Sequence, residues 1–229
     1  MALSTTLLAA SSAAAATLTV SQQSDVHVMY DSDDQNAWYA ATDYLVGSQE
    51  ITNVAAGAFR LTGTDAYGAA MDFLAFCLEP LEGLLHPRDH EMGSNFSAAI
   101  TQKLNTLAAF VWDSVSDHRT AAAFQMAAWE ITTETSGIFD VDDGFFQITG
   151  DGNMSNLAEI TAQSWLDNLS NGTWGDTDSS YMILNAQGTQ DLLTNINMTP
   201  VPLPSSGMTL LAAIGAAGFV ARRRARKTA

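Results

Sequence analysis

The last 29 residues of the chain limit what it can fold into more than any other stretch. Residues 208–221 form an apolar run of 14 residues, and five of the nine basic residues of the chain follow within 222–227. Crossing a bilayer core takes roughly 20 apolar residues, but the uncharged residues 204–207 extend the run and arginine side chains can reach the interface. We therefore predict a transmembrane segment at 208–221 and a basic cytoplasmic tail at 222–229.

The first 16 residues are also predicted to lie outside the fold. They are mostly small and apolar and end in four alanines, which contain the A-x-A pattern that signal peptidases cut. This pattern predicts a signal peptide at 1–16 and an exported protein. The folded domain is then residues 17–198, a length that suits one domain with its own core.

A proline-rich linker at 199–207 joins the predicted domain to the predicted membrane segment. The linker contains a sorting motif, and the segment precedes a basic anchor: Val201, Pro202, Leu203 and Pro204, then Arg222, Arg223, Arg224, Arg226 and Lys227. This order resembles the PEP-CTERM family of bacterial sorting signals, in its VPLPA-type variant. The resemblance implies processing by an exosortase-like enzyme, tethering to the membrane with the C-terminus cytoplasmic, and a final location at the cell surface or outside the cell.

The predicted exported region is strongly acidic. It holds all 25 acidic residues and four of the basic ones, which gives a formal net charge of −21. Such a surface repels phosphate backbones, so the composition argues against a nucleic-acid-binding function. It suits a soluble extracellular protein.

Hydrophobic periodicity divides the domain into strands, helices and further strands. Short apolar and β-branched runs predict early strands at 18–20, 26–30, 51–54, 59–62 and 71–78. Apolar residues at helical spacing over 100–111 predict a first helix. A second helix is predicted at about 119–133, with Asp117 or Thr120 as its cap. A third is predicted at 156–169, where Asn156 and Glu159 have the spacing of a capping box. Later strands are predicted at 145–149, 181–184 and 191–196. We therefore predict an α+β fold, in which a β-rich, sandwich- or barrel-like domain contains an inserted helical subdomain of two to three helices.

The chain has one cysteine, Cys77, followed by an aliphatic and an acidic residue and preceded by Phe76. The second predicted helix carries Gln125 and, four residues later, Trp129. This pair of motifs resembles the thioester domains of bacterial surface adhesins. The resemblance implies an internal thioester between the Cys77 sulfur and the Gln125 side-chain carbonyl, with Trp129 and Phe76 shielding the bond.

The residue types fit this chemistry by themselves. A thiolate that attacks a carboxamide expels ammonia, and because an amide is a poor electrophile, the fold has to enforce the geometry. Trp129 lies one turn beyond Gln125 on the same helix face, and helical side chains lean toward the N-terminus, so we expect the indole to cover Gln125. The alternative interpretation is ordinary helix packing beside a buried, unreactive thiol.

Other candidate sites follow weaker patterns. A cysteine protease would need a histidine presented to Cys77, and the candidates are His86, His90 and His118. His86 and His90 with Asp89 and Glu91 are a candidate metal site, for which a solvated loop is the alternative. Two acidic turns resemble fragments of calcium loops, for which ordinary solvated turns are the alternative: Asp140, Asp142 and Asp143, and Asp31, Asp33 and Asp34. Three aromatic residues are a candidate sugar-stacking platform, for which a place in the core is the alternative: Trp38, Tyr39 and Tyr44.

Taken together, these patterns predict an exported surface or extracellular-matrix protein rather than an enzyme. We expect no cofactor and no metal. The partners are the processing enzyme, the membrane, and an amine-bearing surface target or extracellular polysaccharide. The alternative function is a non-reactive acidic module of the extracellular polymer matrix that binds carbohydrate or cations.

Overall fold

A computed structural model of the chain describes residues 17–22, 39–65, 68–85, 87–150, 153–177 and 181–196. Several predictions lie outside these residues: the signal peptide 1–16, the strand at 26–30, the acidic turn at 31–34, Trp38, His86, the linker with its sorting motif, the transmembrane segment and the basic tail. None of the helices in the described ranges has both the length and the apolar character that crossing a membrane requires.

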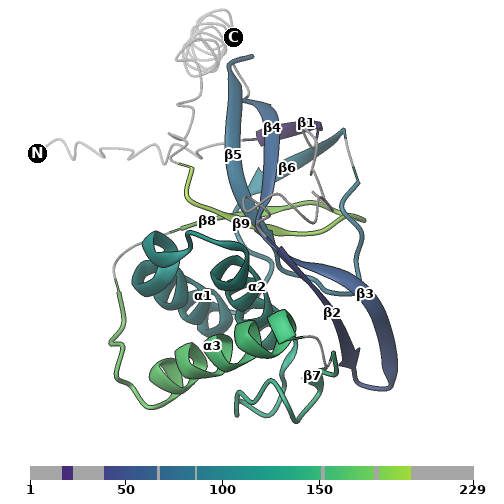
Figure 1. The fold of residues 1–229 in the computed structure, drawn as a ribbon. Helices are drawn as coiled ribbons and strands as arrows, with labels where there is room; N and C mark the ends of the chain where they lie inside the picture. The colour runs from purple at the N-terminus through teal and green to yellow at the C-terminus, as the bar shows by residue number, and fades with distance from the viewer. Residues whose placement is uncertain are drawn as a thin grey trace, which may run out of the picture. The chain divides into compact units, whose positions relative to one another are not determined.

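Six strands form a closed barrel in which every neighbouring pair is antiparallel (Figure 1). Around the barrel, the order is β1 (Thr17–Gln22), β4 (Phe59–Asp65), β5 (Ala70–Cys77), β9 (Leu192–Thr194), β8 (Met182–Asn185) and β6 (Arg88–Met92). Closure leaves the sheet without a free edge, since β1 pairs with both β4 and β6. Strands from both ends of the domain therefore build one barrel.

One face of these strands points into the barrel. The register pairs Leu61 with Phe73 and Leu184 with Leu192, and all four side chains are buried but do not belong to the core that contacts the helices. Cys77 pairs with Leu192 and lies four residues after Phe73. Because side chains alternate along a strand, the thiol lies on this interior face.

A second sheet has the order β3 (Gln49–Gly57), β2 (Tyr39–Val46) and β7 (Phe146–Ile148). The β2–β3 turn contains Gly47, whose φ of 61° suits glycine and whose N–H donates to the Phe145 carbonyl at 2.6 Å. A Cβ at this position would lie 2.9 Å from the Phe145 ring. The turn therefore needs glycine, and it ties the hairpin to the residue before β7.

Three helices pack side by side (Figure 1): α1 (Ala98–Val111), α2 (His118–Thr133) and α3 (Asn153–Ser170). The central helix is α2, because every residue from 121 to 131 is buried and it contacts α1, α3, β2, β3, β5 and β7. Five of those residues are alanines, which allow close approach on all sides. A capping box of Asp117 and Thr120 fixes where α2 begins.

The structure confirms the main architectural predictions and corrects some elements. The β-rich, barrel-like domain with helices inserted between strands is confirmed, as are the cap of α2 and the strand predicted at 71–78, which the structure places at Ala70–Cys77. The prediction that the third helix begins near Asn156 was wrong, because α3 begins at Asn153. The strands β2 and β6 were missed because neither shows a clear apolar alternation. β2 has two small alanines followed by the polar pair Thr42 and Asp43, and β6 is polar except for its last residue.

Candidate functional site

Cys77 is the last residue of β5, and at this position β5 is paired with β9 on one side but no longer with β4 on the other. On one side the Leu78 N–H donates to the Asp191 carbonyl beside β9, at 2.9 Å. Backbone groups alternate in direction along a strand, so the N–H and C=O of Cys77 point the other way, toward β4. The β4 pairing ends where Phe59 meets Ala75, and no β4 residue pairs with Cys77.

The side chain of Gln125 takes the place of the missing strand. The Cys77 N–H donates to Gln125 Oε1 at 3.0 Å, and Gln125 Nε2 donates to the Cys77 carbonyl at 2.5 Å. A primary carboxamide offers the same donor and acceptor as a peptide group, so it can complete the end of a strand. Gln125 is fully buried and Cys77 is 2% exposed. Folding therefore brings the two residues of the predicted thioester together, 48 positions apart in sequence.

The same strand end is fixed by further contacts to α2 and to the β8–β9 region. Thr132 Oγ1 donates to the Leu78 carbonyl at 2.7 Å, one residue beyond Cys77. The Asp191 N–H donates to Glu79 Oε2 at 2.9 Å. These bonds hold β5 against α2 along two helical turns, so the carboxamide of Gln125 has little freedom to leave the strand.

The Cys77 thiol lies in a low-dielectric environment. Burial raises its pKa well above the ordinary range, and the negative charge of Glu79 raises the pKa further. The sulfur is therefore a protonated thiol at neutral pH. A reaction at this sulfur has to remove its proton as the new bond forms.

Aromatic side chains cover this region. The Trp129 ring packs 5.1 Å from the Tyr44 ring and 6.2 Å from the Phe146 ring, and all three are buried. Burial raises the pKa of Tyr44 to about 12, with a smaller contribution from the neighbouring Cys77 thiol, and the Tyr44 hydroxyl donates to the Pro80 carbonyl at 2.6 Å. Tyr44 is therefore a core residue beside Trp129, and it is too deeply buried to form part of a sugar-stacking platform.

Phe76 and Trp129, the two residues expected to shield the bond, lie in different surroundings. Phe76 packs 4.3 Å from Phe124 and 5.5 Å from Trp112, measured between ring centroids. Because consecutive side chains of a strand point to opposite faces, the Phe76 ring lies on the other face of β5 from the Cys77 thiol. Trp129 packs against Tyr44 and Phe146 instead, and its buried indole nitrogen has no hydrogen-bond partner within the part of the chain that the structure describes.

The histidine-based alternatives receive little support from the geometry. His90 is buried in β6 with its two ring nitrogens facing the carbonyls of Arg88 and Gln190, and burial lowers its pKa. The prediction of a solvated loop around His90 was therefore wrong. His118 is the first residue of α2, and Gln125 lies about two helical turns further along the same helix. Across the described ranges, no three histidine, cysteine or acidic side chains are arranged to hold a metal ion.

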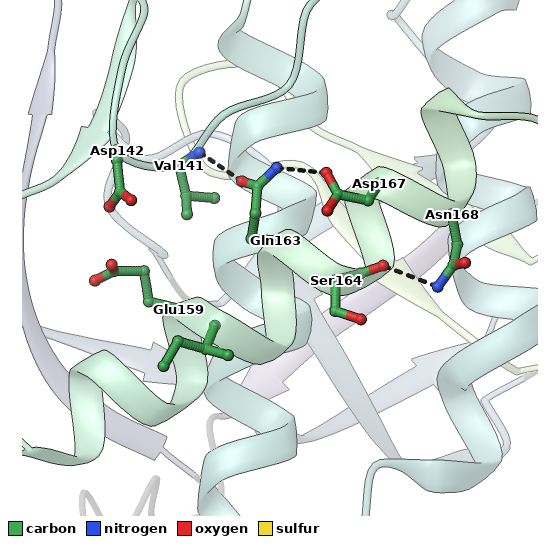
Figure 2. Close-up of a pocket in the computed structure, with 8 residues that line it drawn as sticks. Val141, Asp142, Glu159, Gln163, Ser164, Asp167 and Asn168 are labelled. Carbon is green, nitrogen blue, oxygen red and sulfur yellow. Dashed lines mark hydrogen bonds between the residues drawn. The ribbon is translucent and has the colours of Figure 1, made fainter.

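The remaining acidic turn forms one wall of a cavity of about 550 Å³. Asp140 Oδ1 accepts from the Asp142 N–H at 3.0 Å, and Asp143 Oδ1 accepts from the Gly144 N–H at 2.9 Å. Figure 2 shows the Asp142 carboxyl group facing Glu159 of α3 across this cavity. The turn is therefore held by its own backbone hydrogen bonds and by α3.

Comparison with known proteins identifies the C-terminal region. Residues 200–224 match the PEP-CTERM protein-sorting motif. The chain therefore carries a PEP-CTERM sorting signal, of the kind that exosortase, a membrane processing enzyme, recognises. Such a signal implies export, processing at the membrane and display outside the cell.

No curated protein matches the chain. Among solved structures, the chain is similar to the N-terminal thioester domain of fibronectin-binding protein SfbI from Streptococcus pyogenes, with a TM-score of 0.38 and 13% sequence identity. The alignment covers 74% of this chain and 97% of that one. A similarity of this size bears on neither the fold nor the chemistry of Cys77, which rest on the contacts described above.

Proposed function

We propose that this exported protein attaches covalently to amine-bearing targets through an internal thioester between Cys77 and Gln125. The observation that carries the proposal is the pair of hydrogen bonds between the Gln125 carboxamide and the Cys77 backbone, in a fully buried position. These bonds hold the only cysteine of the chain beside one specific carboxamide. Proximity of this kind is the main requirement for a difficult intramolecular acyl transfer.

The first step would exchange the Gln125 amide for a thioester. The Cys77 sulfur forms a bond to Gln125 Cδ, the bond from Cδ to Nε2 breaks, and Nε2 leaves as ammonia with the thiol proton. The Cys77 N–H already donates to Gln125 Oε1, so it would stabilise the negative charge that this oxygen gains in the tetrahedral intermediate.

The second step would transfer the acyl group to the target. The nitrogen of a neutral amine attacks Gln125 Cδ, the bond from Cδ to sulfur breaks, and Cys77 takes up the proton that the amine loses. The product is an amide between the protein and its target. The reaction happens once per molecule, so the protein is proposed as an adhesin rather than an enzyme, and its acidic surface would attract cationic amines such as lysine side chains.

Intact mass spectrometry of the purified exported domain tests the proposal. Wild type should be lighter than its sequence by one ammonia, and methylamine should add to it. Cys77→Ala and Gln125→Ala should each have the full sequence mass and ignore methylamine. A wild type with full sequence mass that does not react would contradict the proposal.

The second candidate is the non-reactive matrix module. The contacts that favour it are the same two hydrogen bonds, since they satisfy the Cys77 backbone groups without any reaction. An unreactive wild type would leave this function, and binding to extracellular polysaccharide would then be the assay to pursue.

A further inference from the structure

A cavity of about 320 Å³ lies beside the end of β5 that carries Cys77. Its walls come from the loop after β5, from the residues before α1 and from the turn between β8 and β9, and they include Glu79, Glu82, Phe96, residues 186–189 and Asp191. We call this cavity the β8–β9 pocket. Ligand pockets begin at about 300 Å³, so its volume suits one side chain or a small molecule.

The pocket adjoins the Cys77–Gln125 pair through the backbones of β5 and β9. Cys77 pairs with Leu192, the residue after Asp191. The Leu78 N–H donates to the Asp191 carbonyl at 2.9 Å. Asp191 therefore lies on the β9 side of the strand end, whereas the Gln125 carboxamide occupies the β4 side. Neighbouring strands are about 4.8 Å apart, so two strand spacings, on the order of 10 Å, separate the carboxamide from Asp191.

Hydrogen bonds tie two walls of the pocket together. The Asp191 N–H donates to Glu79 Oε2 at 2.9 Å. The side chain of Gln190 accepts from the Glu79 N–H at 3.4 Å and donates to the Glu82 carbonyl. The walls are therefore held in place without a ligand, and binding would cost little conformational entropy.

The pocket gathers three carboxyl groups, and no lysine or arginine is among its described lining residues: Glu79, Glu82 and Asp191. The Asp191 side chain is 3% exposed. Its Oδ1 accepts from the Ala186 N–H at 3.0 Å, whereas its Oδ2 accepts no hydrogen bond from any residue that the structure describes. A buried carboxylate oxygen without a donor is unfavourable. The pocket therefore lacks a cation that can donate to Asp191.

The negative charges of the pocket act on one another. Burial raises the pKa of Asp191 to about 6, the hydrogen bond from the Ala186 N–H lowers it, and the charges of Glu79 and Glu82 raise it further. Asp191 is therefore mostly ionised at neutral pH, next to two like charges. A cation bound in the pocket would relieve this repulsion.

Phe96 gives the pocket an apolar wall. Its ring packs against the core of the domain, and its N–H donates to Ser94 Oγ at 3.1 Å. An aromatic ring beside carboxylates suits a cation on an alkyl chain, because the ring attracts the charge and covers the methylene groups. Lysine and arginine side chains have this composition.

We propose that the β8–β9 pocket binds a basic side chain of the target, next to the lysine whose amine reacts with the thioester. Because the pocket and Gln125 lie on opposite sides of β5, the side chain in the pocket is not the attacking amine. Two residues separated by one other residue in an extended peptide are about 7 Å apart, so their long side chains can reach both places. The partner is then a protein segment with paired basic residues. The effect on reaction rests on the proposed function, whereas binding in the pocket does not.

Binding is tested in Cys77→Ala, which cannot form a thioester. The probes are two acetylated and amidated tripeptides, glycine–glycine–arginine and glycine–glycine–citrulline. Citrulline has nearly the shape of arginine but no charge. We expect the arginine peptide to shift the backbone amide NMR signals of Ala186 and Gly188 saturably, and the citrulline peptide to leave them unchanged. Saturable shifts with calcium chloride, without any with the arginine peptide, would show a metal site and overturn the proposal.

Reaction is tested with the tripeptides lysine–glycine–arginine and lysine–glycine–citrulline, which each carry one reactive amine. Intact mass spectrometry follows the covalent adduct at low peptide concentration. Wild type should react about tenfold faster with the arginine peptide, since the pocket pairs its charge with buried and exposed carboxylates. Methylamine does not need the pocket, so its rate of uptake is the reference for each variant.

Two variants locate the preference. Asp191→Asn keeps an oxygen for the Ala186 N–H but loses the charge, and it should abolish most of the preference. Glu82→Gln keeps the test decisive if Asp191→Asn does not fold, because Glu82 is exposed; it should reduce the preference roughly threefold. Glu50→Gln, an exposed change on β3, is the matched control and should behave as wild type.

The two proposals fail in different ways. Methylamine uptake with equal rates for the arginine and citrulline peptides, and no NMR shift, would leave the thioester intact and overturn the pocket. Saturable shifts with the arginine peptide in a protein that never takes up methylamine would end the thioester proposal. They would support the pocket as a site that binds basic side chains without a covalent bond.

Discussion

Two regions beside the same helix are held by opposite kinds of contact. The end of β5 is fixed by Gln125, a neutral carboxamide whose donor and acceptor both have partners. Glu130, five residues later on α2, fixes the α2–β7 segment (residues 135–145), and one of its carboxyl oxygens has no hydrogen-bond partner among the described residues. Both side chains are fully buried. The first contact should not depend on pH and the second should, so α2 joins a permanent anchor to one that responds to proton concentration.

Removing the neutral anchor should have the largest effect. In the Cys77→Ala background, which cannot form a thioester and keeps both backbone hydrogen bonds, adding Gln125→Ala is expected to lower the free energy of unfolding by about 2–4 kcal/mol, because two buried backbone groups of residue 77 lose their partners. Urea denaturation at neutral pH measures the loss. Equal stability of the single and the double variant would show that Gln125 does not anchor the strand.

Making the neutral anchor titratable should have a somewhat smaller effect that depends on pH. In Gln125→Glu an oxygen replaces Nε2 and faces the Cys77 carbonyl, so the new carboxyl group has to keep its proton to donate there. Its pKa should therefore be raised in the folded protein. In the Cys77→Ala background, the Gln125→Glu protein should be about as stable as the Gln125 protein in acid and should approach Gln125→Ala as the pH rises. A stability difference from Cys77→Ala that stays constant with pH would contradict this account.

The titratable anchor should give the wild type a pH dependence of its own. Burial raises the pKa of Glu130 to about 8. Between the ordinary pKa of a glutamate and about pH 8, Glu130 ionises in the unfolded protein but keeps its proton in the folded one. The free energy of unfolding is therefore expected to fall by about 1 kcal/mol per pH unit over this range. Glu130→Gln should flatten this slope. Thermal or urea unfolding at a series of pH values measures both proteins, and parallel curves would show that Glu130 is not the titrating group.

The smallest expected effect depends on pH in the opposite direction from that of Glu130, because the stability that Asp117 contributes is lost in acid. Asp117 caps α2, and its hydrogen bond from the Thr120 N–H lowers its pKa. Asp117→Ala should lower the free energy of unfolding by about 1 kcal/mol at neutral pH. The difference from wild type should disappear in acid, where the Asp117 carboxylate takes up a proton. A difference that persists below the pKa of Asp117 would mean that the effect comes from packing.

Local patterns in the sequence were sufficient for several features of this protein. The proline motif, apolar run and basic cluster identify the sorting signal, because these parts act as linear segments. The helical stripe of Ile100, Leu104, Leu107 and Val111 located α1, and Asp117 located the start of α2. The motifs around Cys77 and Gln125 resemble those of adhesin thioester domains, and this resemblance singled out two residues that are joined by hydrogen bonds in the structure.

Other features were decided by contacts between distant residues, which no local pattern encodes. Tyr44 joins the site because β2 crosses α2, and Glu130 carries an unpartnered oxygen only because the α2–β7 segment folds back over it. The sequence by itself determined the sorting signal and the presence of three helices, and its resemblance to adhesin thioester domains implied that Cys77 lies beside Gln125. The tertiary structure alone decided which side chains are buried, because burial depends on residues contributed by separate elements. The raised pKa values of Cys77 and Glu130 follow from this burial.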